Sequence, residues 1–137
     1  MASQIQKVMY EGYLGADPEM RFTPKGQPVT NFRIGSTRQY NPDGKTVKEV
    51  TWLRVTAWNS LAEIINKYCA KGSHVIVTGR LRPGENGSPT PYPLSTGGFG
   101  ASYEITAEEV RIIKGKERVA GEGESEVEEP LEDDPFK

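Results

Sequence analysis

The segment Thr51-Trp-Leu-Arg-Val-Thr-Ala-Trp58 is the most informative part of this 137-residue chain. Its residues alternate in character, as in a β-strand, where successive side chains point to opposite faces. One face carries three apolar side chains: Leu53, Val55 and Ala57. The other face carries Trp52, Arg54, Thr56 and Trp58. Because a strand of a small barrel buries only one face, the pattern predicts that the apolar set lines a core and that the indoles face outward.

The residues that follow have the pattern of an amphipathic helix. Apolar side chains recur at i, i+3, i+4 and i+7, at Leu61, Ile64, Ile65 and Tyr68. Ser60 and Glu63 have the spacing of a capping box, which predicts that Ser60 is the N-cap of the helix.

Further runs of alternation predict strands on both sides of this unit. They cover residues 5–14, 19–23, 28–40, 46–59, 74–81 and 103–113, whereas residues 83–100 are rich in turn formers and predict a flexible loop or ribbon. With the short run 19–23 left out of the count, the order is β-β-β-α-β-β, with the helix between the third and fourth strands of a barrel. The predicted fold class is therefore all-β: an OB-fold, a five-stranded antiparallel barrel with one helix closing an end.

Charge divides the chain into two regions. Residues 1–114 contain 14 Lys and Arg against 10 Asp and Glu, whereas residues 115–137 contain 3 against 9, and the whole chain has a net charge of -2. The second region is rich in Gly and Glu and has no apolar period, which is typical of disorder. We therefore expect a folded domain over residues 1–114 and a disordered acidic tail over residues 115–137, each with its own partner.

Composition excludes several classes of protein. No apolar run approaches the ~20 residues of a membrane span, and the N-terminal segment lacks the pattern of a signal peptide. One cysteine, Cys69, is typical of a reducing compartment, so we expect a cytoplasmic protein. A single histidine and a single cysteine also disfavour a structural zinc site.

Catalytic motifs are absent from the sequence. There is no P-loop, GxGxxG, GxSxG or HExxH motif. His74 is interpreted as a strand-end residue, Cys69 as a packed thiol, and Asp17 and Glu19 as turn residues beside Pro18. We therefore predict that the protein is not an enzyme and uses no cofactor or metal.

The outward face of residues 52–58 instead favours nucleic-acid binding. Trp52 and Trp58 are about 20 Å apart at the rise of a strand, with Arg54 between them. Bases stack on exposed aromatic rings and cations meet phosphates, which is the usual design of a single-strand binder. Further candidate side chains near this face are Tyr40, Lys48, Arg80 and Arg82. The alternative is that both indoles belong to a core or to a protein interface.

Several spaced motifs resemble those of the bacterial single-stranded DNA-binding proteins, a family of homotetrameric OB-fold proteins. Residues 15–26 are similar to the family's LGxDPExRxTPxG segment, and residues 52–58 to its WxRV strand. Residues 61–73 are similar to its LAE…YxxKGS segment, and residues 79–82 to its GxLR motif. The resemblance covers residues 5–82 and, weakly, residues 102–113.

The resemblance implies roles for individual residues. Trp52, Trp58 and Tyr40 match base-stacking aromatics, and Arg54 matches a basic residue of the binding strand. It also implies sequence-tolerant binding of single-stranded DNA in replication, recombination and repair, on the nucleoid, by a homotetramer. The family's aromatic after the GxLR motif is absent here, because Pro83 follows Arg82. The rival function is an OB-fold protein-interaction module that does not bind DNA.

The C-terminal residues resemble the acidic tip through which the family docks partner proteins. The matching residues are Asp133, Asp134, Pro135 and Phe136. The resemblance implies that replication, recombination and repair proteins bind through residues 131–137. One departure is that Lys137 follows Phe136, where the family ends its chain.

Overall fold

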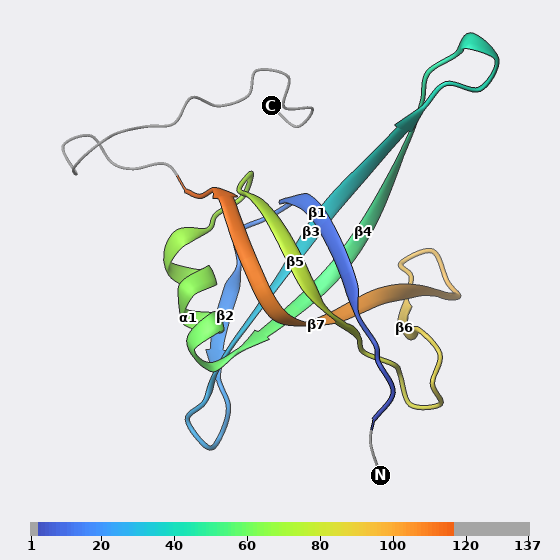
Figure 1. The fold of residues 1–137 in the computed structure, drawn as a ribbon. Coiled ribbons are helices and arrows are strands. Elements are labelled where there is room, and N and C mark those ends of the chain that lie inside the picture. The colour runs from blue at the N-terminus through green and yellow to red at the C-terminus, as the bar shows by residue number, and fades with distance from the viewer. Residues whose placement is uncertain (1–2, 117–137) are drawn as a thin grey trace.

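The computed structural model describes residues 3–116 (Figure 1). Within this range the elements are β1 (Val8–Leu14), β2 (Glu19–Phe22), β3 (Pro28–Tyr40), the short 3-10 helix η1 (Pro42–Gly44), β4 (Val47–Trp58), α1 (Asn59–Tyr68), β5 (His74–Leu81), β6 (Thr90–Pro93) and β7 (Phe99–Lys114). The helix lies between the strand that carries the two tryptophans and β5, as the sequence pattern predicted.

Five of these strands close into a barrel. The ring runs β1-β5-β7-β4-β3 and returns to β1 through the pairs Tyr13–Gly35 and Leu14–Ile34. Four of the five pairings are antiparallel, and the pairing of β4 with β7 is parallel. Strand directions cannot alternate all the way round a ring with an odd number of members, so at least one parallel pair is unavoidable. The OB-fold class is confirmed.

The barrel interior is filled by the inward faces of these strands. Leu53, Val55 and Ala57 of β4 are all buried, which confirms the polarity predicted for this strand. Helix α1 contributes the buried Ala62 and Ile65. The Thr30 hydroxyl of β3 donates a 2.8 Å hydrogen bond to the carbonyl oxygen of Ala62, so a buried polar group is satisfied where the helix meets the barrel.

The predicted capping box at the start of α1 is wrong. The helix begins at Asn59, Trp58 takes the N-cap position, and no side-chain hydrogen bond caps this end. Asn59 has a φ of 59°, a left-handed conformation that Asn tolerates better than most residues. The chain therefore turns directly from β4 into the helix, and Ser60 falls inside the first turn.

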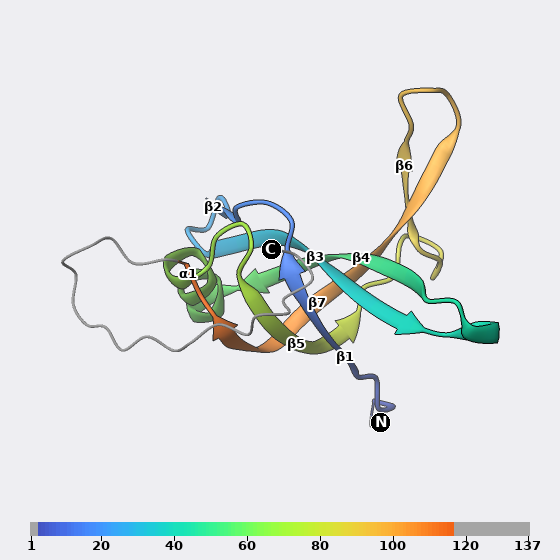
Figure 2. The same cartoon turned by 90° about the horizontal axis from the view of Figure 1, so that it is seen from above.

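Two β-ribbons extend from the barrel (Figure 2). One is the β3–β4 hairpin, which ends at η1. The other is formed by β6 and the first residues of β7, which pair from Thr90–Ser102 to Pro93–Phe99. The segment 83–100 is thus partly a ribbon, and the last strand begins at Phe99, four residues before the predicted start.

Glycine permits a close backbone approach between β1 and β3. A Cβ at Gly12 of β1 would lie 2.6 Å from the carbonyl oxygen of Gly35 in β3.

No helix within residues 3–116 is long and apolar enough to cross a membrane.

Candidate nucleic-acid interface

The outer face of β4 presents both tryptophans to solvent. Trp52 is 43% exposed and Trp58 is 42% exposed, although the alternating residues between them are buried. Arg54 lies between the two indoles and is also exposed. The strand therefore displays a cation between two aromatic rings, on the face that the core does not use.

The indole of Trp52 lies against two glycines from neighbouring segments. A Cβ at Gly15 would be 2.8 Å from Cζ3 of the ring, and a Cβ at Gly35 would be 3.0 Å from the same atom. Gly35 is directly opposite Trp52 in the β3–β4 register. The amide of Gly15 donates a 3.1 Å hydrogen bond to the carbonyl oxygen of Arg33. Because neither glycine has a side chain, both leave room for the Trp52 indole.

Arg33 is a residue of this face that the sequence interpretation did not name. Its guanidinium carbon lies 4.7 Å from the centroid of the Trp52 ring, within the range of a cation–π interaction. Arg33 is also directly opposite Arg54. The alternation of residues 28–40 already places Arg33 on the outward face. Its position beside Trp52, however, depends on how β3 pairs with β4.

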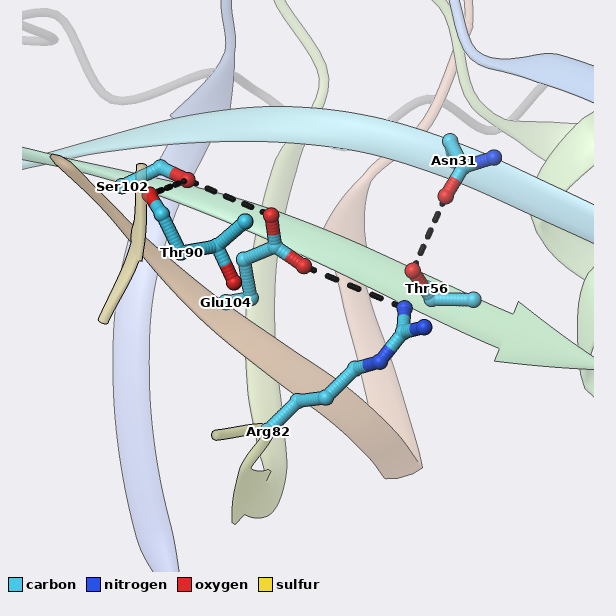
Figure 3. Close-up of polar contacts among 6 residues, drawn as sticks. All are labelled: Asn31, Thr56, Arg82, Thr90, Ser102 and Glu104. Atoms are coloured by element: carbon cyan, nitrogen blue, oxygen red, sulfur yellow. Dashed lines mark hydrogen bonds and ion pairs between the residues drawn. The ribbon is translucent and has the colours of Figure 1, made fainter. Parts of the chain in front are cut away.

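Arg54 belongs to a row of charged residues that crosses three strands. It lies opposite Arg33 on β3 and opposite Glu104 on β7. Arg82, one residue after β5, approaches the same carboxylate, with 3.8 Å between its Nη1 and Oε1 of Glu104 (Figure 3). Directly opposite side chains on paired strands lie about 5 Å apart at Cβ. The row therefore places the Glu104 carboxylate beside the Arg82 guanidinium and on the strand position opposite Arg54.

Arg80 lies on the same outer face, two residues along from that row. It is opposite Thr106 of β7, which is in turn opposite Thr56 of β4. The Thr56 hydroxyl donates a 2.9 Å hydrogen bond to Oδ1 of Asn31 (Figure 3). Arg80 is exposed, and no carboxylate within residues 3–116 forms an ion pair with it.

Lys48 and Tyr40 lie on opposite faces of the β3–β4 ribbon. Lys48 is an even number of residues from Trp52 and Arg54 on β4, so it continues their face toward the tip of the ribbon. Tyr40 has the alternation of the buried Ile34 and lies on the opposite face. The structure therefore does not place Tyr40 beside the two tryptophans.

The polar groups around Tyr40 satisfy one another. The guanidinium carbon of Arg38 lies 4.4 Å from the Tyr40 ring centroid. Glu49 accepts a 3.1 Å bond from Arg38 and a 3.4 Å bond from the Tyr40 hydroxyl. This cluster lies where the ribbon has left the barrel, so its face is exposed although it continues the core face.

The residues considered for catalysis have structural roles. His74 is buried, bonded through Nε2 to Oε2 of Glu11 at 2.7 Å and stacked on Tyr13 with 4.3 Å between ring centroids. Cys69 is also buried, and burial raises the pKa of its thiol, which therefore stays protonated at neutral pH. Within residues 3–116 no group of three or more His, Cys, Asp or Glu could hold a metal ion.

A closed OB-fold barrel with exposed indoles set among arginines is the arrangement of the nucleic-acid-binding barrel proteins. Within that class, the chain belongs to the single-strand binding protein family, whose model matches residues 5–90. This match confirms the resemblance seen in the sequence motifs. Proteins of this family are DNA-binding proteins and not enzymes, in agreement with the sequence interpretation.

Three relatives illustrate the extent of the similarity. The chain is 31% identical over 118 residues to the single-stranded DNA-binding protein of Neisseria meningitidis serogroup A, covering 85% of this chain and 64% of the relative. It is 41% identical over 83 residues to single-stranded DNA-binding protein 1 of Chlorobaculum tepidum, covering 60% of this chain and 51% of the relative. It is 39% identical over 113 residues to the single-stranded DNA-binding protein of Corynebacterium glutamicum, covering 80% and 48% respectively. The matches thus span about half to two thirds of the length of these relatives.

The predicted partner-docking residues lie outside the described range. These are Asp133, Asp134, Pro135 and Phe136, within the predicted tail over residues 115–137.

Proposed function

We propose that this protein binds single-stranded DNA with little sequence preference. Bases stack on Trp52 and Trp58, while Arg54 and its neighbours neutralise phosphates. The observation that carries the proposal is the exposure of both indoles on one strand face, with Arg54 between them and Arg33 over Trp52. Stacking tolerates any base because every base has a π-face, and phosphates are common to all sequences.

The path of the DNA strand follows from this arrangement. DNA runs along β4 and spans the roughly 20 Å between the two indoles. Lys48 extends the same face toward the ribbon tip. Arg80 and Arg82 flank it from the β5 side, and we propose phosphate contacts for them as well.

Intrinsic fluorescence tests this proposal directly, because Trp52 and Trp58 are the only tryptophans in the chain. Titration with oligo(dT) should quench their emission. Affinity should fall with salt at a log–log slope of about -0.7 per contacted phosphate. Oligo(dA) and a mixed sequence should bind similarly. An unchanged emission spectrum would favour the rival function, a protein-interaction module whose indoles lie in a preformed interface.

A homotetramer on the nucleoid is part of the same proposal. It is supported by the resemblance of residues 5–82 to a homotetrameric family. A protein that coats DNA during replication, recombination and repair works in the cytoplasm, where the chromosome lies. Multi-angle light scattering of the full chain should give four times the mass of the monomer. A mass of one or two chains would limit the resemblance to the fold of the single subunit.

We also propose a division of labour between residues 1–114 and residues 115–137. The first region binds DNA, and the second recruits replication, recombination and repair proteins through Asp133, Asp134, Pro135 and Phe136. Acidic residues around a phenylalanine suit an apolar pocket with a basic rim.

Deletion of residues 131–137 should abolish capture of such proteins while DNA affinity stays unchanged or rises slightly at low salt. Phe136→Ala should reproduce the loss of capture without the rise in DNA affinity, because it removes no charge. Weaker DNA binding after the deletion would contradict the division.

A further inference from the structure

Glu104 is an acidic residue within a face that we propose to bind phosphates. It lies opposite Arg54, with Arg33 one strand further on, and it forms an ion pair with Arg82. Directly opposite residues on paired strands lie close enough to interact, so the charge of Glu104 acts on Arg54 as well as on Arg82. Neither the family match nor the stacking model gives this carboxylate a role.

The two partners of the ion pair differ in how firmly they are held. The Glu104 side chain is 14% exposed, whereas that of Arg82 is 57% exposed. Oε2 of Glu104 accepts a 3.2 Å hydrogen bond from the Ser102 hydroxyl, which also lies 3.4 Å from the carbonyl oxygen of Thr90 (Figure 3). The carboxylate is therefore anchored at the base of the β6–β7 ribbon.

Arg82 is anchored through its backbone instead. Its amide donates a 2.7 Å hydrogen bond to the carbonyl oxygen of Glu104, so the two residues stay adjacent. Its guanidinium, at 3.8 Å from the carboxylate, is held by charge attraction rather than by a hydrogen bond. The guanidinium can turn to another anion without disturbing the backbone or the Glu104–Ser102 bond.

We propose that Glu104 competes with DNA for Arg82. A DNA phosphate must displace the Glu104 carboxylate before it can bind the Arg82 guanidinium. The inference rests on the proposed function. In the free protein, Glu104 partly neutralises Arg82. When DNA binds, a phosphate takes over the guanidinium and leaves a poorly solvated carboxylate nearby, where its repulsion is only weakly screened. Glu104 thereby lowers both the affinity for DNA and the salt dependence of binding.

Glu104→Gln tests this idea, because glutamine keeps the shape of the side chain and can still accept the Ser102 hydrogen bond. At low salt, oligo(dT) should bind roughly two- to five-fold more tightly, as expected for a partly exposed charge pair. The log–log salt slope should become more negative, by up to about 0.7. Glu109→Gln is the matched control, since it removes an exposed charge further along β7, opposite Thr78. It should leave affinity nearly unchanged.

A double-mutant cycle separates competition from a general charge effect. In an Arg82→Gln background, Glu104→Gln should lose most of its gain in affinity. An equal gain in both backgrounds, or in Glu109→Gln, would overturn the inference. So would weaker binding by a folded Glu104→Gln, which would mean that the carboxylate orients Arg82 for DNA.

A second comparison leaves Glu104 intact. Arg80 and Arg82 lie two residues apart, and only Arg82 has a carboxylate partner within residues 3–116. Arg82→Gln should therefore weaken binding and flatten the salt slope less than Arg80→Gln. An equal or larger effect at Arg82 would count against the competitor role. Failure of the wild-type protein to bind oligo(dT) would overturn the proposed function itself, and this inference with it.

Discussion

The middle and the C-terminal end of β4 carry tryptophans with almost the same exposure and different surroundings. Trp52 lies against Gly15 and Gly35 and has Arg33 over its ring. Trp58 is the last residue of its strand and the N-cap of α1, and within residues 3–116 no cation lies over its ring. Exposure alone therefore does not measure how well an aromatic ring is prepared for stacking. A ring held before binding loses less conformational entropy when a base arrives.

Trp52→Ala should have the largest effect on DNA binding. It removes a stacking platform that is already held, and the expected loss is about 1–3 kcal/mol in oligo(dT) affinity. Folding should survive, because the side chain lies outside the core. Fluorescence anisotropy of labelled oligo(dT) measures the loss, and a thermal melt checks the fold. Trp52→Phe is the control and should retain most of the affinity. Unfolding of the alanine variant alone would assign Trp52 to a structural role.

Trp58→Ala should weaken binding less, toward the lower end of the same range, about 1 kcal/mol. Its ring has to be ordered when DNA binds, so part of the stacking energy is lost to that ordering. The same anisotropy titration measures the difference between the two alanine variants. A larger loss at Trp58 than at Trp52 would reverse the comparison.

Gly35→Ala should affect binding by less than either tryptophan deletion. The new Cβ would lie 3.0 Å from Cζ3 and Cη2 of Trp52, so the indole has to shift by a few tenths of an ångström. We expect a lower affinity and a changed Trp emission maximum. In a Trp52→Ala background the same substitution should change affinity very little. An undiminished effect there would show that Gly35 acts through the backbone rather than through the ring.

Tyr40→Ala should have the smallest effect, below about 1 kcal/mol, the low end of what one stacked base contributes. Tyr40 lies on the other face of the ribbon, and its hydroxyl is engaged by Glu49 at 3.4 Å. Tyr40→Phe, which removes only that bond, should be close to wild type. A loss at Tyr40→Ala as large as that at Trp52→Ala would mean that DNA wraps round the ribbon and contacts both faces.

Much of the barrel could be predicted because it depends on local alternation. Strand β4 shows this, since Leu53, Val55 and Ala57 are buried and their neighbours Trp52 and Arg54 are exposed. A period of two survives in any tertiary context that buries one face. The start of α1 was less predictable. The left-handed turn at Asn59 replaced the capping box that the Ser60–Glu63 spacing indicated.

By itself, the sequence determined the class of the protein: a small β-barrel with one helix and an outward strand face of aromatic and basic residues. These properties follow from patterns within single segments. Tertiary structure alone decided which distant residues meet. The β3–β4 register brings Arg33 and Gly35 to Trp52 and turns Tyr40 to the opposite face, and the parallel β4–β7 pair brings Glu104 to Arg54. The physical reason is that a contact between strands depends on their relative register, and a shift of one residue would reverse every face.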